Sequence, residues 1–290
     1  MKIGFNEGSN WDCKNHSVMK DLEYCEKYGF DYIEFQSRCL NEELEAGTIT
    51  IEEISDWLKH HNVKVNSYNA LVGFNMRKTE EEKEAVIEEL KEDIRRCKAF
   101  GTDIVLLVPS EDLDHPATVK EIREDAVDML RRMLKVAEPE GIRLALEFCG
   151  QPNVSISRLE DAWPIVQEVN HPLVGLVLDQ YHFHAMGCGW DTLEKVDGSR
   201  IFVWHCMDTE DLPVAAPYNK YANRLWPGDP RGAMDLKRYA DTLKRIGFKE
   251  GVCMVEVFRP EYYELTQEEN VKQAAEYMKK YVETYCADFD

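Results

Sequence analysis

The chain has 290 residues, 44% hydrophobic composition and a formal net charge of −20, which is enough apolar material for a substantial core. A surface this acidic repels phosphate backbones and argues against a nucleic-acid-binding protein. The sequence has no run of about 18 apolar residues, as a membrane span requires, and its N-terminus MKIGFNEG lacks the apolar core of a secretion signal.

The nine cysteines show no paired close spacing and no CxxC motif. An odd number of widely spaced cysteines is typical of reduced thiols in the cytosol. We therefore expect a cytoplasmic protein whose cysteines serve as small buried hydrophobic residues.

Short β-rich apolar runs alternate with amphipathic helical segments along the whole chain. The first helical segment, VMKDLEYCEKYGF, stops at Gly29 just before an apolar run. The same order of helix, glycine and strand recurs at Gly101, Gly141 and Gly247. The predicted strands are residues 2–6, 32–36, 63–69, 103–109, 143–148, 174–180, 201–208 and 251–258.

Eight strands that alternate with helices predict a parallel sheet covered by helices. A chain of this length fits a closed (β/α)₈ TIM barrel, and we predict a single such domain over residues 1–290. The competing fold, a doubly wound open sheet, usually carries a glycine-rich phosphate turn after its first strand. The segment FNEGSN at that place lacks the spaced glycines.

Polar side chains stand at the carboxyl ends of the last four predicted strands. RLALEF ends near Glu147, GLVLDQ near Asp179, IFVWHCMD near His205 and VCMVEVF near Glu256. In a barrel these strand ends are neighbours on one rim, where active sites lie. We therefore expect the four side chains to converge on one volume.

Three carboxylates in one pocket would repel one another and raise their pKa values. A divalent cation removes that repulsion. Three carboxylates and one imidazole suit Mn²⁺, Mg²⁺ or Co²⁺, and Zn²⁺ is a further option. Four protein ligands leave positions for substrate oxygens. We predict that Glu147, Asp179, His205 and Glu256 are metal ligands.

Two further histidines follow Asp179. His182 could be a ligand, orient another ligand or shuttle a proton, and His184 has a weaker case. The remaining histidines are predicted to be surface residues: His16, His60, His61, His115 and His171.

These motifs resemble the xylose isomerase-like (β/α)₈ barrels, and the resemblance spans essentially the whole chain. The residues that carry it are Glu147, DQYH at 179–182, WHCMD around His205, WPGDPRGAMD at 226–235 and VEVF around Glu256. The family includes sugar isomerases, epimerases and dehydratases, among them enzymes that act on inososes. C-glycoside deglycosidase α-subunits look similar as well.

The resemblance implies a divalent metal, most often Mn²⁺, bound by the four residues predicted above. It also implies that Glu147 and Glu256 move protons on either side of a ketose or enediol, and that His182 contacts the substrate. Two positions depart from the ketose 3-epimerases, which have a second glutamate and an arginine where this chain has Asn153 and Asp211. A plain 3-epimerase is therefore disfavoured.

Endonuclease IV, a three-zinc enzyme of the same superfamily, needs additional histidines. At those places this chain has Asn66 or Tyr68, Pro109 or Ser110, and Arg231. The missing ligands and the acidic net charge both argue against DNA repair.

Several residues near the predicted loops could contact a sugar. Arg224 lies in the loop 209–225, and Arg259 follows Glu256 closely. Tyr68 and Trp226 could pack against a sugar face. With His182, these residues form the predicted substrate-binding set.

Three functions remain open. The first is a metal-dependent isomerase or epimerase that acts on a keto-sugar or inosose through an enediolate. The second is a lyase on the same scaffold, either a dehydratase or a deglycosidase α-subunit that acts on 3-keto-glycosides. The third is a non-catalytic barrel subunit that keeps the metal.

The expected partner is a small sugar or keto-polyol, without nucleic acid or membrane. We expect a homo-oligomer, or a hetero-oligomer with a small subunit if the chain is a deglycosidase.

Overall fold

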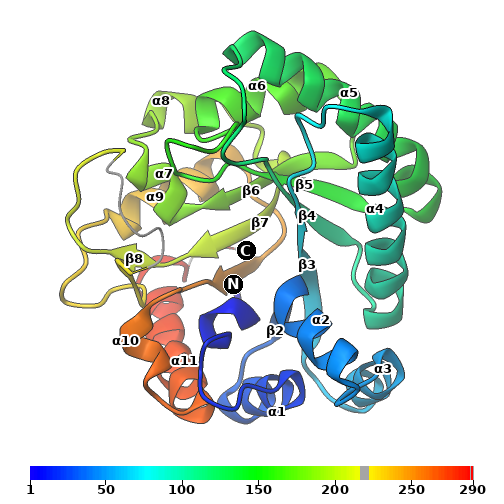
Figure 1. Ribbon diagram of the computed structural model, residues 1–290. Coiled ribbons are helices and arrows are strands. Elements are labelled where there is room, and N and C mark those ends of the chain that lie inside the picture. The colour runs from blue at the N-terminus through cyan, green and yellow to red at the C-terminus, as the bar shows by residue number, and fades with distance from the viewer. Residues whose placement is uncertain (216–221, 288, 290) are drawn as a thin grey trace.

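The computed structural model describes residues 1–215, 222–287 and 289. Eight parallel strands close into a barrel in the order β1-β10-β7-β6-β5-β4-β3-β2 (Figure 1), which confirms the predicted (β/α)₈ architecture. The barrel strands are β1 (Lys2–Asn6), β2 (Tyr32–Gln36), β3 (Lys64–Val72), β4 (Ile104–Val108), β5 (Arg143–Glu147), β6 (Val174–Asp179), β7 (Ile201–Cys206) and β10 (Val252–Val255).

Helices surround this barrel (Figure 1). Those of ten or more residues are α1 (Val18–Tyr28), α2 (Ser37–Ala46), α3 (Ile51–His60), α4 (Glu80–Phe100), α5 (Val119–Ala137), α6 (Leu159–Val169), α9 (Leu236–Ile246) and α11 (Gln267–Tyr285). The shorter ones are α7 (Gln180–Ala185), α8 (Trp190–Leu193) and α10 (Pro260–Tyr263). Among the described residues, no helix is both long enough and apolar enough to cross a membrane.

Local sequence signals set where these helices begin and end. Four helices, α3, α4, α5 and α11, begin with a capping box in which a threonine and the glutamate three residues later satisfy each other's backbone N–H groups. The predicted glycine stops are also present. Gly29, Gly101 and Gly247 cap α1, α4 and α9 with φ of 81°, 77° and 85°, a conformation that favours glycine.

Strand periodicity directs four polar side chains into the barrel. Side chains alternate between the two faces of a strand, so residues two apart face the same side. An apolar cluster fills the barrel interior. Four of its residues, one on each of the last four barrel strands, lie two residues before a polar residue. These pairs are Ala145 and Glu147, Val177 and Asp179, Val203 and His205, and Met254 and Glu256.

A small hairpin follows the seventh barrel strand. The predicted strand 201–208 ends earlier, at Cys206, and Asp208–Thr209 (β8) pairs antiparallel with Arg224–Leu225 (β9). This pairing returns the chain toward the barrel and buries the Arg224 side chain, which is 1% exposed.

Candidate metal centre

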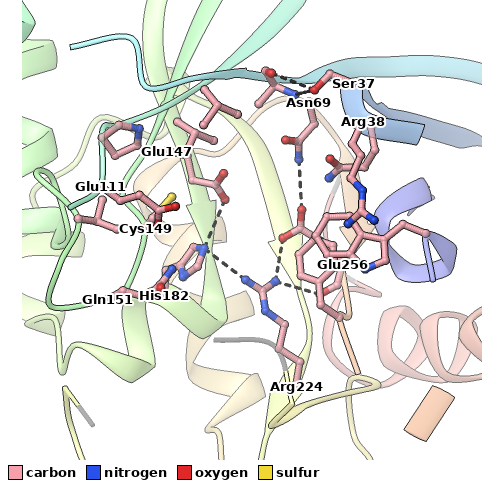
Figure 2. Close-up of a pocket in the computed structure, with 18 residues that line it drawn as sticks. Ser37, Arg38, Asn69, Glu111, Glu147, Cys149, Gln151, His182, Arg224 and Glu256 are labelled. Carbon is pink, nitrogen blue, oxygen red and sulfur yellow. Dashed lines mark hydrogen bonds and ion pairs between the residues drawn. The ribbon is translucent and has the colours of Figure 1, made fainter. Parts of the chain in front are cut away.

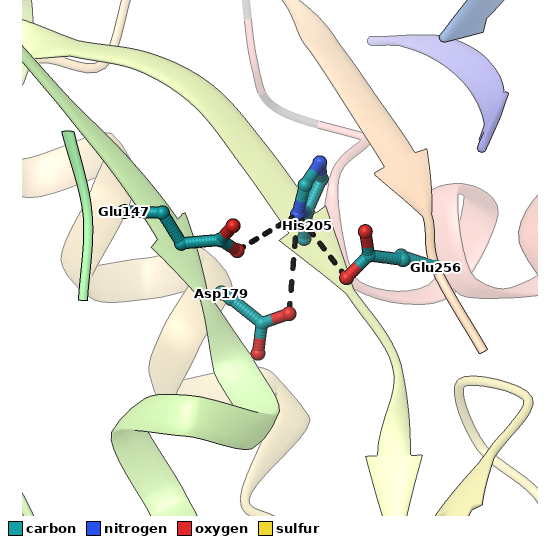
Figure 3. A group of neighbouring side chains, drawn as sticks. All are labelled: Glu147, Asp179, His205 and Glu256. Atoms are coloured by element: carbon teal, nitrogen blue, oxygen red, sulfur yellow. Dashed lines mark ion pairs between the residues drawn. The ribbon is translucent and has the colours of Figure 1, made fainter. Parts of the chain in front are cut away.

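The structure brings the four predicted metal ligands together at the carboxyl ends of β5, β6, β7 and β10 (Figure 3). His205 Nδ1 lies 3.5 Å from Glu147 Oε1, 3.5 Å from Glu256 Oε2 and 3.9 Å from Asp179 Oδ2. One ligand atom from each residue lies within 4.8 Å of all the others. All four side chains are buried.

The donor atoms fit a divalent cation. In the part of the chain that the structure describes, the buried Glu147 Oε1 and His205 Nδ1 have no hydrogen-bond partner, although unpaired buried polar atoms are costly. Tetrahedral ligands about 2.1 Å from an ion lie roughly 3.4 Å apart, which is close to the separations between His205 Nδ1 and the two glutamate oxygens. An ion at this position would satisfy both unpaired atoms.

Crowded negative charge perturbs the protonation of the site. Burial raises the pKa of Glu256 to about 8, against the opposing effect of His205 and Arg224. Burial would also raise the pKa of Asp179, but Arg224 and two nearby imidazoles lower it to about 2. A cation among these carboxylates would favour the charged form of each one.

Arg224 provides a fixed positive charge at the site, and Figure 2 shows its guanidinium between His182 and Glu256. Its Nη1 donates to Asp179 Oδ2 at 3.0 Å and to Glu256 Oε2 at 2.7 Å. The guanidinium also lies 4.7 Å from the ring centroid of Tyr181 and 4.9 Å from that of Phe258. Its burial among rings and carboxylates restricts it to one place.

His182 lies in α7 at the edge of the same group. Asp179 is the N-cap of this helix, and its Oδ1 accepts from the His182 backbone N–H at 2.7 Å. The ring Nε2 is 3.2 Å from Arg224 Nη2, so it accepts a hydrogen bond there, and it lies 3.9 Å from Glu147 Oε1. Burial lowers the pKa of His182, which favours a neutral imidazole.

A pocket opens directly onto this group (Figure 2). Glu147, His182, Arg224 and Glu256 line it, together with residues from the other strand ends. Trp11 forms an aromatic wall, stacked on Phe258 with centroids 4.6 Å apart. The pocket therefore combines charged groups with an aromatic face, an arrangement suited to a polar ring such as a sugar or polyol.

Three residues predicted to bind substrate, Tyr68, Trp226 and Arg259, do not line this pocket. Tyr68 precedes the lumen-facing Asn69 by one residue, so its ring points outward and its hydroxyl accepts from Arg96 at 2.5 Å. Trp226 is 1% exposed and stacks on Tyr262. The Arg259 guanidinium binds Glu210 and Glu261. Proximity in sequence to a loop did not predict which way these side chains point.

His16 also departs from its predicted place on the surface. Its side chain is 11% exposed, and Nε2 lies 2.9 Å from Asp21 Oδ2 and 3.9 Å from Glu7 Oε1. Burial would lower the pKa of His16, but Asp21 and the other nearby carboxylates raise it to about 9. The side chain therefore belongs to a buried ionic group near the start of the chain.

Sequence reasoning also missed polar residues on the first three strands. Asn6, Glu34 and Asn69 are buried inside the barrel and contact His205 or Glu256. The signal that revealed the four predicted ligands, a polar residue in an apolar strand near its carboxyl end, is present in KIGFN, YIEFQ and VNSYN as well.

Comparison with known proteins agrees with this site. The family model described as xylose isomerase-like TIM barrel matches residues 22–281. The chain is 40% identical over 297 residues to an inosose isomerase of Bacillus licheniformis, covering 98% of this chain and 99% of that protein. A crystal structure of the IolI protein with a binding zinc atom superposes with a TM-score of 0.91 at 39% identity, over 98% of this chain and 99% of the other.

A more distant relative is a 3-dehydroshikimate dehydratase of Pseudomonas putida. It is 23% identical over 159 residues, which cover 55% of this chain and 24% of that protein.

The chain belongs to the xylose isomerase-like TIM barrel family. Within it, the near-full-length similarity to several isomerases and the four-residue site identify an isomerase built around a divalent-metal centre.

Proposed function

We propose that the chain is an inosose isomerase, which moves a keto group between neighbouring carbons of a cyclic polyol. The observation that carries this proposal is the convergence of Glu147, Asp179, His205 and Glu256 beside an open pocket. Its support from relatives is the 40% identity to an inosose isomerase over nearly the full chain.

The four converging residues would hold the ion, and the pocket would hold the polyol. A bound divalent cation would withdraw electron density from a ketone oxygen and an adjacent hydroxyl oxygen, which acidifies the C–H bond of the hydroxyl-bearing carbon. The aromatic wall at Trp11 is suited to pack against the apolar face of the ring.

We assign the transfer of the proton to two carboxylates. Glu147 and Glu256 approach from opposite sides of His205 (Figure 3). Removal of the C–H proton by Glu147 leaves its electron pair in the C=C bond of an enediolate, and the former ketone oxygen takes the negative charge. Return of a proton to the former ketone carbon, from Glu147 or from Glu256, and transfer of the hydroxyl proton to the former ketone oxygen complete the isomerisation.

Arg224 and His182 are the proposed contacts to the substrate oxygens. Both line the pocket, and the neutral His182 ring can exchange a proton with a hydroxyl group. The Arg224 guanidinium stabilises negative charge on an enediolate oxygen.

For the ion we propose Mn²⁺, because three carboxylates and one imidazole form a hard to borderline ligand set. Zn²⁺ is the direct alternative, since a zinc atom is bound in the IolI crystal structure. Reconstitution of chelator-treated protein with each ion, followed by assay, distinguishes them.

A lyase is the second candidate, favoured by the similarity to a dehydratase. Loss of a β-hydroxyl or of an aglycone from the enediolate would replace proton return. Epimerisation would follow if the proton returned to the other face of the same carbon.

The test is a panel of inososes, keto-sugars and 3-keto-glycosides incubated with the metal-loaded protein in D₂O. Nuclear magnetic resonance and mass spectrometry would follow deuterium uptake and product mass. An isomerase moves the keto group and changes the mass of the sugar only by the deuterium that it takes up. Release of water or an aglycone would favour a lyase, and a metal-loaded protein that exchanges no substrate proton would favour a non-catalytic barrel.

We propose a small keto-polyol as the partner, in a homo-oligomer located in the cytosol. The widely spaced, buried cysteines support the cytosolic location.

A further inference from the structure

A fourth carboxylate, Glu34, lies fully buried beneath the metal centre. It stands on β2, two residues after Tyr32, which packs against the barrel's interior cluster, so its side chain points into the lumen. Its Oε1 accepts from His205 Nε2 at 2.9 Å and from Asn69 Nδ2 at 3.0 Å. Ser67 Oγ donates to the other oxygen. Glu34 is therefore held on both oxygens.

The contact to Glu34 defines the orientation of His205. Because the carboxylate accepts from Nε2, the ring presents Nδ1 to Glu147, Asp179 and Glu256. A neutral imidazole with its proton on Nε2 carries its lone pair on Nδ1, where a cation would bind. Glu34 thus selects the tautomer that can act as a ligand.

The same network reaches a second predicted ligand. Asn6 Nδ2 donates to Glu34 and, at 2.9 Å, to Glu256 Oε1. Asn69 Nδ2 likewise joins Glu34 to Glu256 Oε1, at 3.2 Å from the latter. With Oε1 held by two amides, Glu256 is left with Oε2 facing the site.

From these contacts we infer that Glu34 is a positioning residue that sets metal affinity, by orienting His205 directly and Glu256 through Asn6 and Asn69. Glu34 itself contributes no ligand atom and does not line the pocket. The inference rests on the proposed function for the identity of the site, but its test measures the metal rather than the reaction.

The main test replaces Glu34 with glutamine. Glu34→Gln keeps an oxygen that can accept from His205 but removes the charge that increases the basicity of the ring. We expect Zn²⁺ affinity to fall about 10- to 100-fold, measured by competition with a chromophoric chelator. The visible absorption of the Co²⁺-loaded variant should also shift, because the ligand field at His205 changes.

The matched control is Asp93→Asn, which removes a carboxylate that is also buried (4% exposed) but lies on α4, outside the barrel. Its Zn²⁺ affinity and Co²⁺ spectrum should equal those of the wild type. A second variant, Ser67→Ala, removes only the hydroxyl that holds the far oxygen of Glu34. We expect a smaller loss of affinity, by a few-fold, and it keeps the inference testable if Glu34→Gln does not fold.

The outcomes separate this inference from the proposed function. Wild-type Zn²⁺ affinity and Co²⁺ spectrum in folded Glu34→Gln would overturn the positioning role. The same result in folded Ser67→Ala, where Glu34→Gln does not fold, would do so as well. Weakened metal binding, with no isomerisation of any inosose by wild-type protein, would support the role of Glu34 and reject the proposed substrate.

Discussion

At the residue scale, Glu256 is the carboxylate at which polar and charged groups of the site meet. One of its oxygens accepts from two asparagines, and the other faces both His205 and the Arg224 guanidinium. Burial nevertheless raises its pKa to about 8. The surroundings of this carboxylate therefore make its charged form costly unless a cation is close to it.

The raised pKa of Glu256 predicts how stability depends on pH without metal. Between pH 4.5, the ordinary pKa of a glutamate, and about pH 8, Glu256 keeps its proton in the folded state but loses it in the unfolded state. The free energy of unfolding should therefore fall as pH rises through that window. Between pH 6 and 8 we expect Glu256 alone to contribute about 1–3 kcal/mol of this fall in chelator-treated protein, measured by denaturant unfolding.

Glu256→Gln should reduce this slope without abolishing it, because burial also raises the pKa of Glu7 to about 8. Asp179 acts in the opposite direction. Its pKa is lowered from the usual 3.8 to about 2, so the charged Asp179 side chain stabilises the fold at pH values above 3.8. This stabilisation is lost as the pH falls toward 2. If the free energy of unfolding depended on pH equally in wild type and in Glu256→Gln, the raised pKa of Glu256 would be contradicted.

Glu256→Gln should also impair the chemistry. The variant loses a proposed metal ligand and proton carrier, so we expect deuterium exchange next to the substrate carbonyl to slow by about 10²- to 10⁴-fold. The control is Glu261→Gln, at a carboxylate that is 55% exposed. Exchange at the wild-type rate in Glu256→Gln would rule out Glu256 as a proton carrier.

At the element scale, the position of α7 depends on a close contact with the loop after β5. A Cβ atom built on Gly150 would lie 2.7 Å from both the Cα and the carbonyl oxygen of His182. Because this clash would be with backbone atoms, no side-chain rotation could relieve it. Gly150 therefore lets this loop and α7 pack closely enough to hold His182 over the pocket.

Gly150→Ala should displace His182, whose backbone N–H also binds Asp179 Oδ1, while Glu147, His205 and Glu256 stay in place. We expect kcat/KM to fall about 10- to 100-fold, since small displacements of a contact residue are costly, with a smaller loss of Zn²⁺ affinity. Gly189→Ala is the control, because its Cβ would meet only the ends of two side chains, Glu160 and Thr192. Full activity in Gly150→Ala would show that His182 needs no such placement.

At the scale of the whole molecule, the site draws on strands that adjoin one another only in the closed barrel. Asp179 lies directly opposite His205 in the pairing of β6 with β7, and Met254 opposite His205 in the pairing of β10 with β7. An ion that bridges these strands would bind the folded state far better than the unfolded one.

Removal of the metal should therefore destabilise the entire barrel. Free Zn²⁺ or Mn²⁺ at 100 times its Kd should stabilise the protein by about 2.7 kcal/mol relative to chelator-treated protein. Thermal unfolding with and without the ion measures this difference, with Ca²⁺ at equal ionic strength as the control. An unchanged Tm would contradict binding at a site that depends on the fold.

The sequence by itself determined the eight strands, the capping boxes and glycine stops, and the four side chains of the metal centre. These follow from local rules: strand periodicity places Glu147 two residues after an interior alanine, and an N-cap threonine selects its own helix start. Only the tertiary structure decided that Arg224 is buried against Asp179, that Tyr68 points outward and that Glu34 meets His205. Glu34 and His205 are 171 residues apart in the chain, and such contacts exist only once the barrel closes and brings distant strands to one axis.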